Sequence, residues 1–151
     1  MAAKKPLCTV NAVVEAPCGL VAALLTTVSA GPVGPHNGFF LAHGPDPDLR
    51  LRGGPNEFWA AIAGNPNGIR VEVDRAQAML AVEGKWWFRA ECRVLPHPKG
   101  ARMTQQVFNI ATSARWMVPM VARGVEGKQR GSMQRLLDRI SGHLGCPAYL
   151  E

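Results

Sequence analysis

Four side chains in this sequence could donate, accept or orient a proton without help from a metal: His36, His43, Gln105 and Asn109. A histidine titrates near neutral pH, so His36 or His43 could serve as a general acid or base. Buried amides need hydrogen-bond partners, and a ligand carbonyl or hydroxyl could provide them for Gln105 and Asn109. We take these four residues as the candidate catalytic set, with a surface or structural role for either histidine as the alternative.

The sequence lacks the motifs that indicate several other kinds of chemistry. The chain contains no nucleophile elbow, no phosphate-binding P-loop and no dinucleotide fingerprint. Its four cysteines form no C-x-x-C pair and have no zinc-ligand spacing with histidine, which favours free thiols in a reducing cytoplasm. Asp46 and Asp48 share a turn, but a calcium loop needs several more oxygen ligands. We therefore expect no metal and no cofactor.

Large apolar side chains near the same segments could line a binding cavity. Trp86 and Phe88 fall on one face of a strictly alternating segment, and Met103 and Gln105 share a face of the next one. The second segment alternates weakly, so either of its faces could point inward. The candidate ligand-binding residues are Trp59, Trp86, Phe88, Met103, Val107, Trp116, Met117 and Met120. The methionines among them fit an ordinary core equally well.

The hydrophobic pattern predicts strands, a short helix, more strands and then a long helix. The strongest signal is a hairpin whose strands, 86–95 and 101–110, are joined by a Pro/Gly turn. The last helix, at about 113–143, carries an apolar stripe, and its glycines and Pro119 predict a break near its middle. The other predicted elements are a helix at 18–28 and strands at 7–14, 37–44, 49–52, 69–73 and 79–83. Residues 58–63 read as a helical turn or an irregular segment.

Composition indicates one globular domain spanning residues 1–151. The 151 residues are 47% hydrophobic and 19% charged, and no apolar run is long enough for a transmembrane helix. The net charge of +6 is uneven, because residues 84–140 hold eleven Lys/Arg against three acidic residues, a local +8. This basic half could be a solvated surface, or it could meet an acidic partner or an anionic membrane surface. Nucleic acid is disfavoured, because no nucleic-acid motif accompanies the charge.

The first residues could also be read as an export signal. Lys4 and Lys5 precede apolar residues, and Val28-Ser29-Ala30 resembles a signal-peptidase site. Glu15 and Pro17 interrupt the apolar stretch, however, so a strand followed by a helix explains it better. We expect a cytoplasmic protein.

One superfamily combines these features. The run from Cys8 through Ala16-Pro17, continuing to Val21 and residues 23–26, resembles the opening strand, corner and helix of START-like (SRPBCC) proteins. The hairpin at 86–110 and the final helix near Arg139-Ile140 are similar to that superfamily as well. The chain departs from the family pattern at three places, with Ala22 where the helix has a tryptophan, Thr27 where it has an acidic residue, and Gly31–Pro35 in place of an aromatic stretch.

The resemblance implies an α+β helix-grip, in which a curved antiparallel sheet wraps around a long C-terminal helix and encloses an internal cavity. Members of the superfamily include polyketide cyclases, lipid-transfer domains and carriers. The implied function is binding of a polyketide-, isoprenoid- or lipid-like molecule, either alone or with cofactor-free cyclase or dehydratase chemistry by acid–base catalysis. The protein would be a monomer or a homodimer.

Two alternatives from other classes remain. Residues 23–43 and 58–94 resemble strands of flavin- or deazaflavin-dependent split-barrel oxidoreductases, with Asn65-Pro66 at a similar turn. In that alignment Phe58 occupies the place of the family's phosphate-binding lysine, and the long final helix has no counterpart. The basic half alone would also fit an interaction module that acts on ribosomes or acidic proteins.

Overall fold

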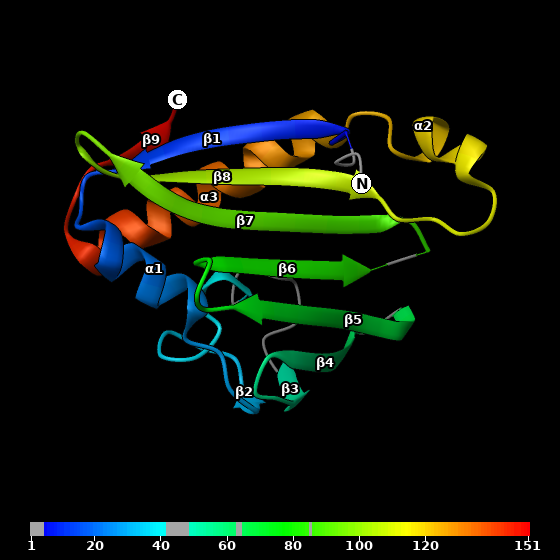
Figure 1. Cartoon of the computed structure of the whole chain (residues 1–151), viewed down its shortest axis with the longest axis horizontal. Coiled ribbons are helices and arrows are strands. Elements are labelled where there is room, and N and C mark those ends of the chain that lie inside the picture. The colour runs from blue at the N-terminus through cyan, green and yellow to red at the C-terminus, as the bar shows by residue number, and fades with distance from the viewer. Residues whose placement is uncertain (1–4, 42–48, 63–64, 85) are drawn as a thin grey trace.

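The chain folds as an α+β helix-grip, in which a nine-stranded antiparallel sheet packs against a long helix (Figure 1). The computed structural model describes residues 5–41, 49–62, 65–84 and 86–151. The strands are β1 (Cys8–Val14), β2 (Gly31–Pro32), β3 (Arg50–Gly53), β4 (Glu57–Ile62), β5 (Asn65–Asp74), β6 (Met79–Gly84), β7 (Phe88–His97), β8 (Gly100–Asn109) and β9 (Ala148–Leu150). The helices are α1 (Cys18–Thr26), η1 (Phe39–Leu41), η2 (Arg115–Met117), α2 (Val118–Val121) and α3 (Val125–Leu144).

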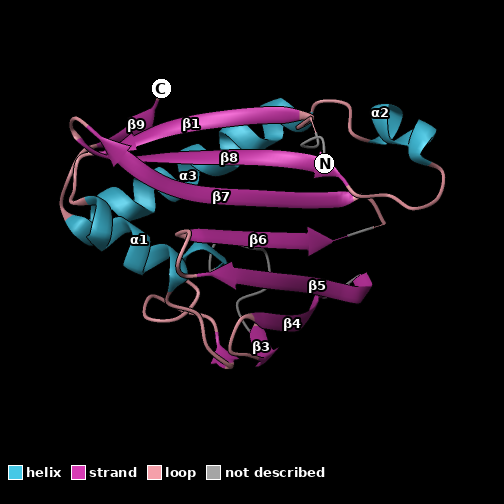
Figure 2. Ribbon diagram, viewed as in Figure 1, coloured by secondary structure: helices cyan, strands magenta, loops and turns pink. Residues whose placement is uncertain are grey.

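The strand order follows the chain except at one edge. The order is β2-β3-β4-β5-β6-β7-β8-β1-β9, so each strand from β2 to β8 pairs with the next one in sequence. At that edge, β1 pairs with β8 on one side and with β9 on the other (Figure 2). The sheet is therefore open at both edges, unlike the barrel that the oxidoreductase alternative requires.

The buried side chains show which face of the β7–β8 hairpin points into the core. Met103 and Val107 on β8 are 0% exposed, and Cys92 and Val94 on β7 are 5% and 3% exposed. These residues occupy the inner face of the sheet, the face that α1 and α3 cover. The face of β8 that carries Met103 and Asn109 therefore points inward. This is one of the two orientations that the sequence left open.

Side chains on the inner face form two apolar clusters. The larger cluster joins the middle of the sheet to α1 and to the second half of α3, through Val21, Leu25, Met133, Leu137 and Ile140. The smaller cluster gathers Cys8, Trp87, Val107, Ala111 and Val118 at the end of the sheet where β8 finishes. Each helix buries one apolar face here, and this burial keeps both helices on the sheet.

The long final helix is broken, as its glycines predicted. Gly124 has a φ of 73° and sits as the left-handed residue before α3, so α2 and α3 are separate helices. A glycine adopts this conformation without the steric cost that a side chain would add. The break lets residues 115–121 project beyond the ends of β7 and β8 (Figure 1).

Three predicted segments differ from the observed structure, and the short strand β9 was not predicted. Residues 39–41 of the predicted 37–44 strand form the helix η1, because Phe39, Phe40 and Leu41 are all buried. Residues 58–62 of the predicted segment 58–63 belong to β4, where Phe58 faces inward and Trp59 outward, so both faces are apolar and no strand period results. Asn65-Pro66, which the oxidoreductase alternative placed at a turn, lies within β5. The strand β9 was missed because it is only three residues long.

No helix among the described residues is long and apolar enough to span a bilayer.

Candidate functional site

The inner face carries a strip of apolar side chains that remain partly exposed. The strip consists of Ile69 on β5, Val82 on β6, and Phe88 and Ala90 on β7, all of intermediate burial. Val82 and Ala90 are register partners, and Gly84 lies beside Ile69 and Phe88. We call these four residues the inner strip.

The helices explain why the inner strip is not sealed. Helix α3 approaches the sheet most closely at β1 and β9. Helix α1 packs on β6, β7 and β8, at the side of the sheet where β6 begins and β7 ends (Figure 1). At the end of β5–β7 near Gly84 and Phe88, neither helix makes such an approach. Apolar surface that would be completely buried in a filled helix-grip therefore stays accessible there.

A pair of amides borders the inner strip. The Gln105 side chain on β8 donates a hydrogen bond from Nε2 to Oε1 of Gln129 on α3. This bond links helix to sheet between the two apolar clusters. Each amide keeps further hydrogen-bonding capacity, since Gln105 still has its carbonyl oxygen and Gln129 its NH2 group. The pair can thus orient a polar group on an otherwise apolar molecule.

Asn109, the second amide of the candidate catalytic set, has a local role. Its Oδ1 accepts a hydrogen bond from the backbone N–H of Ala111 at 2.9 Å, which shapes the chain where β8 ends. Its side chain faces the same side of the sheet as Gln105 because the two positions are four residues apart on one strand.

The structure places His36 away from the inner strip. His36 lines a separate hollow of about 190 Å³ with Leu24, Thr27, Pro35, Asn37, Phe39 and His143. This hollow lies between the end of α1 and the end of α3, whereas Gln105 faces the beginning of α3. His43 lies outside the described residues.

The predicted ligand-binding residues fall into four places. Met103 and Val107 are fully buried core residues, and Phe88 belongs to the inner strip. Trp59 is 44% exposed and pairs with Arg52 and Arg70 on the outer face. The remaining residues are exposed near the end of the sheet: Trp86, Trp116, Met117 and Met120.

Trp87, which sequence reasoning passed over, is the buried member of the Trp86-Trp87 pair. It is 4% exposed, whereas Trp86 is 44% exposed. The strand β7 begins only at Phe88, so the alternation read from Trp86 onward does not apply to this pair. The Trp87 ring packs edge-on against Phe88, with 5.4 Å between ring centroids, and so supports one end of the inner strip.

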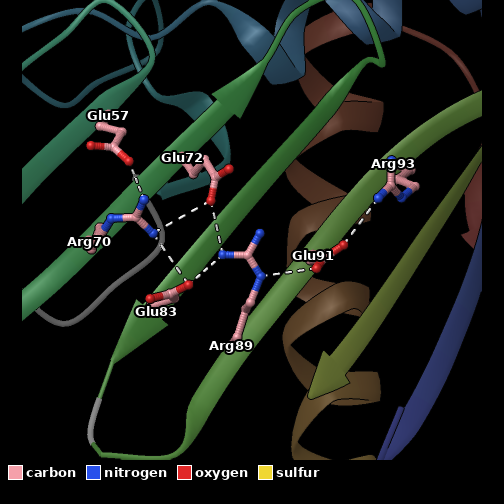
Figure 3. Close-up of polar contacts among 7 residues, drawn as sticks. All are labelled: Glu57, Arg70, Glu72, Glu83, Arg89, Glu91 and Arg93. Atoms are coloured by element: carbon pink, nitrogen blue, oxygen red, sulfur yellow. Dashed lines mark hydrogen bonds and ion pairs between the residues drawn. The ribbon is translucent and has the colours of Figure 1, made fainter. Parts of the chain in front are cut away.

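The outer face of the sheet carries a network of alternating charges (Figure 3). Arg89 on β7 lies at its centre and contacts one glutamate on each of three strands. Arg70 on β5 similarly contacts Glu57, Glu72 and Glu83. We call the seven residues of Figure 3 the charge network: Glu57, Arg70, Glu72, Glu83, Arg89, Glu91 and Arg93.

The charge network acts as a cover for the outer face. Ala81 lies between Glu72 and Glu91 in the register and is 0% exposed, although α1 and α3 both pack on the opposite, inner face. Burial alone would lower the pKa of Arg89, but its hydrogen bonds to Glu91, Glu83 and Glu72 raise that pKa overall. Hydrogen bonding to Glu57 is the main cause that raises the pKa of Arg70. The arginines therefore stay charged and paired, which is a structural role.

The sequence did contain a signal for this network. Arg70 and Glu72, and likewise Arg89, Glu91 and Arg93, occur at every second position, so each set faces one side of its strand. The partners on neighbouring strands depend on register, which the sequence alone does not specify.

A second, open hollow of about 750 Å³ lies at one side of the charge network. Its walls include Glu57 and Glu72 of the network, together with Asp74 and Arg75. Arg75 already bonds three oxygens, those of Pro55, Asn56 and Val28. This hollow is wide and open, and Arg75 in its lining already uses two of its nitrogens in these bonds.

Cys8 and Cys92 are not activated as nucleophiles, and the described residues contain no metal cluster. Burial raises the pKa of Cys92 to about 12 and also raises the pKa of Cys8. Both thiols therefore stay protonated at neutral pH. Within the described ranges, no group of three or more His, Cys, Asp or Glu side chains is arranged to hold a metal ion.

Comparison with known proteins adds one structural similarity. No family model and no curated protein matches the chain. Among solved structures the chain is similar to the crystal structure of protein NE0264 from Nitrosomonas europaea, a structural-genomics target. The two are 16% identical, and the match covers 89% of this chain and 96% of that chain with a TM-score of 0.45. The fold described above rests on the strands, their register and their burial.

Proposed function

We propose that this protein is a START-like carrier that binds a hydrophobic small molecule, of the polyketide, isoprenoid or lipid type, against its inner strip. The observation that carries this proposal is the partial exposure of four apolar side chains on the face of the sheet that the helices otherwise bury. Binding sites for small molecules are typically concave and apolar with a few polar groups that fix orientation. The inner strip with the Gln105–Gln129 pair has this composition.

The polar groups beside the inner strip favour binding over catalysis. The amides of Gln105 and Gln129 can orient a carbonyl or hydroxyl, but an amide does not titrate and therefore cannot move a proton at neutral pH. His36, the titratable candidate that the structure describes, lies in the separate hollow near His143. We accordingly propose carriage or sequestration of the ligand, rather than acid–base turnover, for the inner strip.

The test is binding of 1-N-phenylnaphthylamine, a probe that becomes fluorescent in apolar surroundings. The variant Ala90→Phe would fill space on the inner face of β7, and Gln106→Phe places the same ring on the outer face of the neighbouring strand. We expect saturable binding to the native protein, at least tenfold weaker binding to Ala90→Phe, and unchanged binding to Gln106→Phe.

Two results would overturn the proposal. One is probe fluorescence that does not saturate with the native protein, and the other is equal affinity of the native protein and Ala90→Phe. Melting temperatures of both variants check that each remains folded. A second inner variant, Val82→Phe, repeats the test from the adjacent strand if Ala90→Phe unfolds.

The role of Gln105 can be measured separately. Replacing Gln105 with leucine removes the bond to Gln129 but keeps an apolar wall. We expect Gln105→Leu to weaken binding of a long-chain alcohol more than binding of the matching alkane, because only the alcohol loses a hydrogen-bond partner. Equal weakening of both would remove Gln105 from the site.

A further inference from the structure

The segment η2–α2 exposes an unusual concentration of apolar side chains. Trp116 is 75% exposed, Met120 66%, Val121 50% and Met117 37%. Monomeric proteins rarely expose a contiguous patch of this kind unless another surface covers it. We call these four residues the apolar tip.

The apolar tip stands on a fixed base. Val118 lies in the middle of the same segment, is 0% exposed, and packs in the small cluster with Trp87 and Val107. Arg115 strengthens this base by donating hydrogen bonds from Nη1 to the backbone oxygens of Asn109 and Ala111, at 3.4 Å and 3.3 Å. Because the base is anchored, the η2–α2 segment is held beyond the ends of β7 and β8 (Figure 1), and its four apolar side chains are exposed there.

Four cations lie close to the apolar tip in the sequence, and among the described residues none of them forms an ion pair with a carboxylate. Residues 112–130 contain Arg115, Arg123, Lys128 and Arg130 against the single acidic residue Glu126, a local charge of +3. Within the part of the chain that the structure describes, the ion pairs involve other arginines, those of the charge network and Arg102. The four cations near the tip are all exposed.

We propose that the apolar tip and its four cations form a docking surface for an anionic lipid bilayer. Tryptophan is favoured at the bilayer interface, and a short apolar segment can enter the headgroup region without spanning the membrane. Basic residues next to such a segment are attracted to anionic lipids. Charge complementarity therefore selects an anionic membrane as the occupant of this surface. This inference is independent of ligand binding at the inner strip, because it uses no residue of that strip.

The experiment is co-sedimentation of the full chain with two kinds of vesicle, phosphatidylcholine alone and phosphatidylcholine mixed with phosphatidylglycerol. We expect binding to the mixed vesicles, weaker binding to the neutral ones, and a decline as salt concentration rises. The double variant Trp116→Ser/Met120→Ser removes apolar contact, and Arg123→Gln/Lys128→Gln removes charge. Each should weaken binding to the mixed vesicles by about tenfold or more.

Matched control variants change the same kind of residue elsewhere. Leu20→Ser/Leu95→Ser removes two side chains that are 49% and 45% exposed, and Arg50→Gln/Arg52→Gln removes two exposed charges at the far side of the sheet. Arg50→Gln/Arg52→Gln makes the same charge change as Arg123→Gln/Lys128→Gln. We expect both controls to keep most of the binding.

Three outcomes would overturn the proposal. They are absence of binding to the mixed vesicles, equal binding to neutral and mixed vesicles, and equal losses in the control and tip variants. Sedimentation equilibrium adds a fourth, which is self-association that Trp116→Ser/Met120→Ser abolishes, in the absence of vesicle binding. That result would assign the apolar tip to contact with a second copy of the chain.

Discussion

The body of the sheet and the η2–α2 end differ in where their side chains find partners. In the body, Leu137 and Ile140 of α3 are 0% exposed against the inner face, and on the outer face Arg89 is enclosed by glutamates. At the η2–α2 end, Trp116 is 75% exposed, and the nearby Arg123 is exposed as well. Apolar and arginine side chains thus find their partners within the chain in the body of the sheet, whereas at the η2–α2 end they face solvent.

This difference separates residues that stabilise the fold from residues that are available for function. Apolar burial and paired charges lower the free energy of the folded chain, whereas exposed apolar groups contribute little to it. Exposed tryptophan and methionine side chains contribute little to folding stability. A patch of such side chains therefore indicates a surface that a binding partner covers. The following substitutions measure that separation.

The largest contrast is expected between two apolar truncations. Leu137→Ala removes a side chain at the centre of the large cluster, so we expect it to lower the free energy of unfolding by about 3 kcal/mol. Val121→Ala removes a side chain that is 50% exposed, so its effect should stay below about 0.5 kcal/mol. Urea denaturation of both variants provides the comparison. Equal effects would mean that the tip contributes to the core.

A smaller contrast is expected between two arginines. Arg89→Met leaves Glu72, Glu83 and Glu91 without their shared cation, and we expect a loss of about 2 kcal/mol in the free energy of unfolding. The loss should shrink in acid, where carboxylates become protonated. Arg123→Met, at the η2–α2 end, should change stability by less than about 0.5 kcal/mol. A small loss for Arg89→Met at neutral pH would show that the charge network is dispensable.

The third contrast concerns pH. Burial raises the pKa of Cys92 from its ordinary value of 9.0 to about 12, so its contribution to stability is present below pH 9 and is lost as pH rises toward 12. At pH 10 the native protein should therefore lose about 1 kcal/mol relative to Cys92→Ala, after the difference at pH 7 is subtracted. Denaturation curves at the two pH values measure this loss. If the stability of the two proteins changes with pH in the same way, the Cys92 thiol has the same pKa in the folded and the unfolded chain.

The smallest effect is expected for the variant that alters the proposed docking surface. Trp116→Ser/Met120→Ser should change the free energy of unfolding by less than about 0.5 kcal/mol, because both side chains are largely exposed. A loss as large as that of Leu137→Ala would indicate that these side chains are buried in solution, and the comparison between the two regions would fail.

The sequence predicted the central part of the sheet well for a physical reason. In β7, apolar residues from Phe88 to Val94 alternate with charged residues from Arg89 to Arg93, so the period of two is visible without knowledge of the partner strands. The same is true of Val71 and Val73 in β5. In α3 the stripe of Met133, Leu137 and Ile140 defines a helix face in the same way. The alternation in β8 is weaker, so the sequence left its inward face open.

Prediction was weaker where burial is not periodic. Phe58 and Trp59 place large rings on opposite faces of β4, which hides the strand. Phe39, Phe40 and Leu41 are all buried in one turn of η1, which imitates an apolar strand. The candidate site depends on where helices stop covering the sheet, and that is a property of packing between distant segments. The exposed state of Trp116 and Met120 could not be read from their types, since both are usual core residues.

The short strand β9 also determines how the sheet behaves toward other chains. Three residues, Ala148–Leu150, pair with Ala12, Val13 and Val14, and Glu151 holds their end by donating its N–H to Asn11 and binding Arg102. An uncovered β1 would present unpaired backbone groups to any extended segment it met, which is a known start of aggregation. Detachment of these few residues would therefore move the open edge of the sheet from β9 to β1 and would also remove the contacts between β9 and α3.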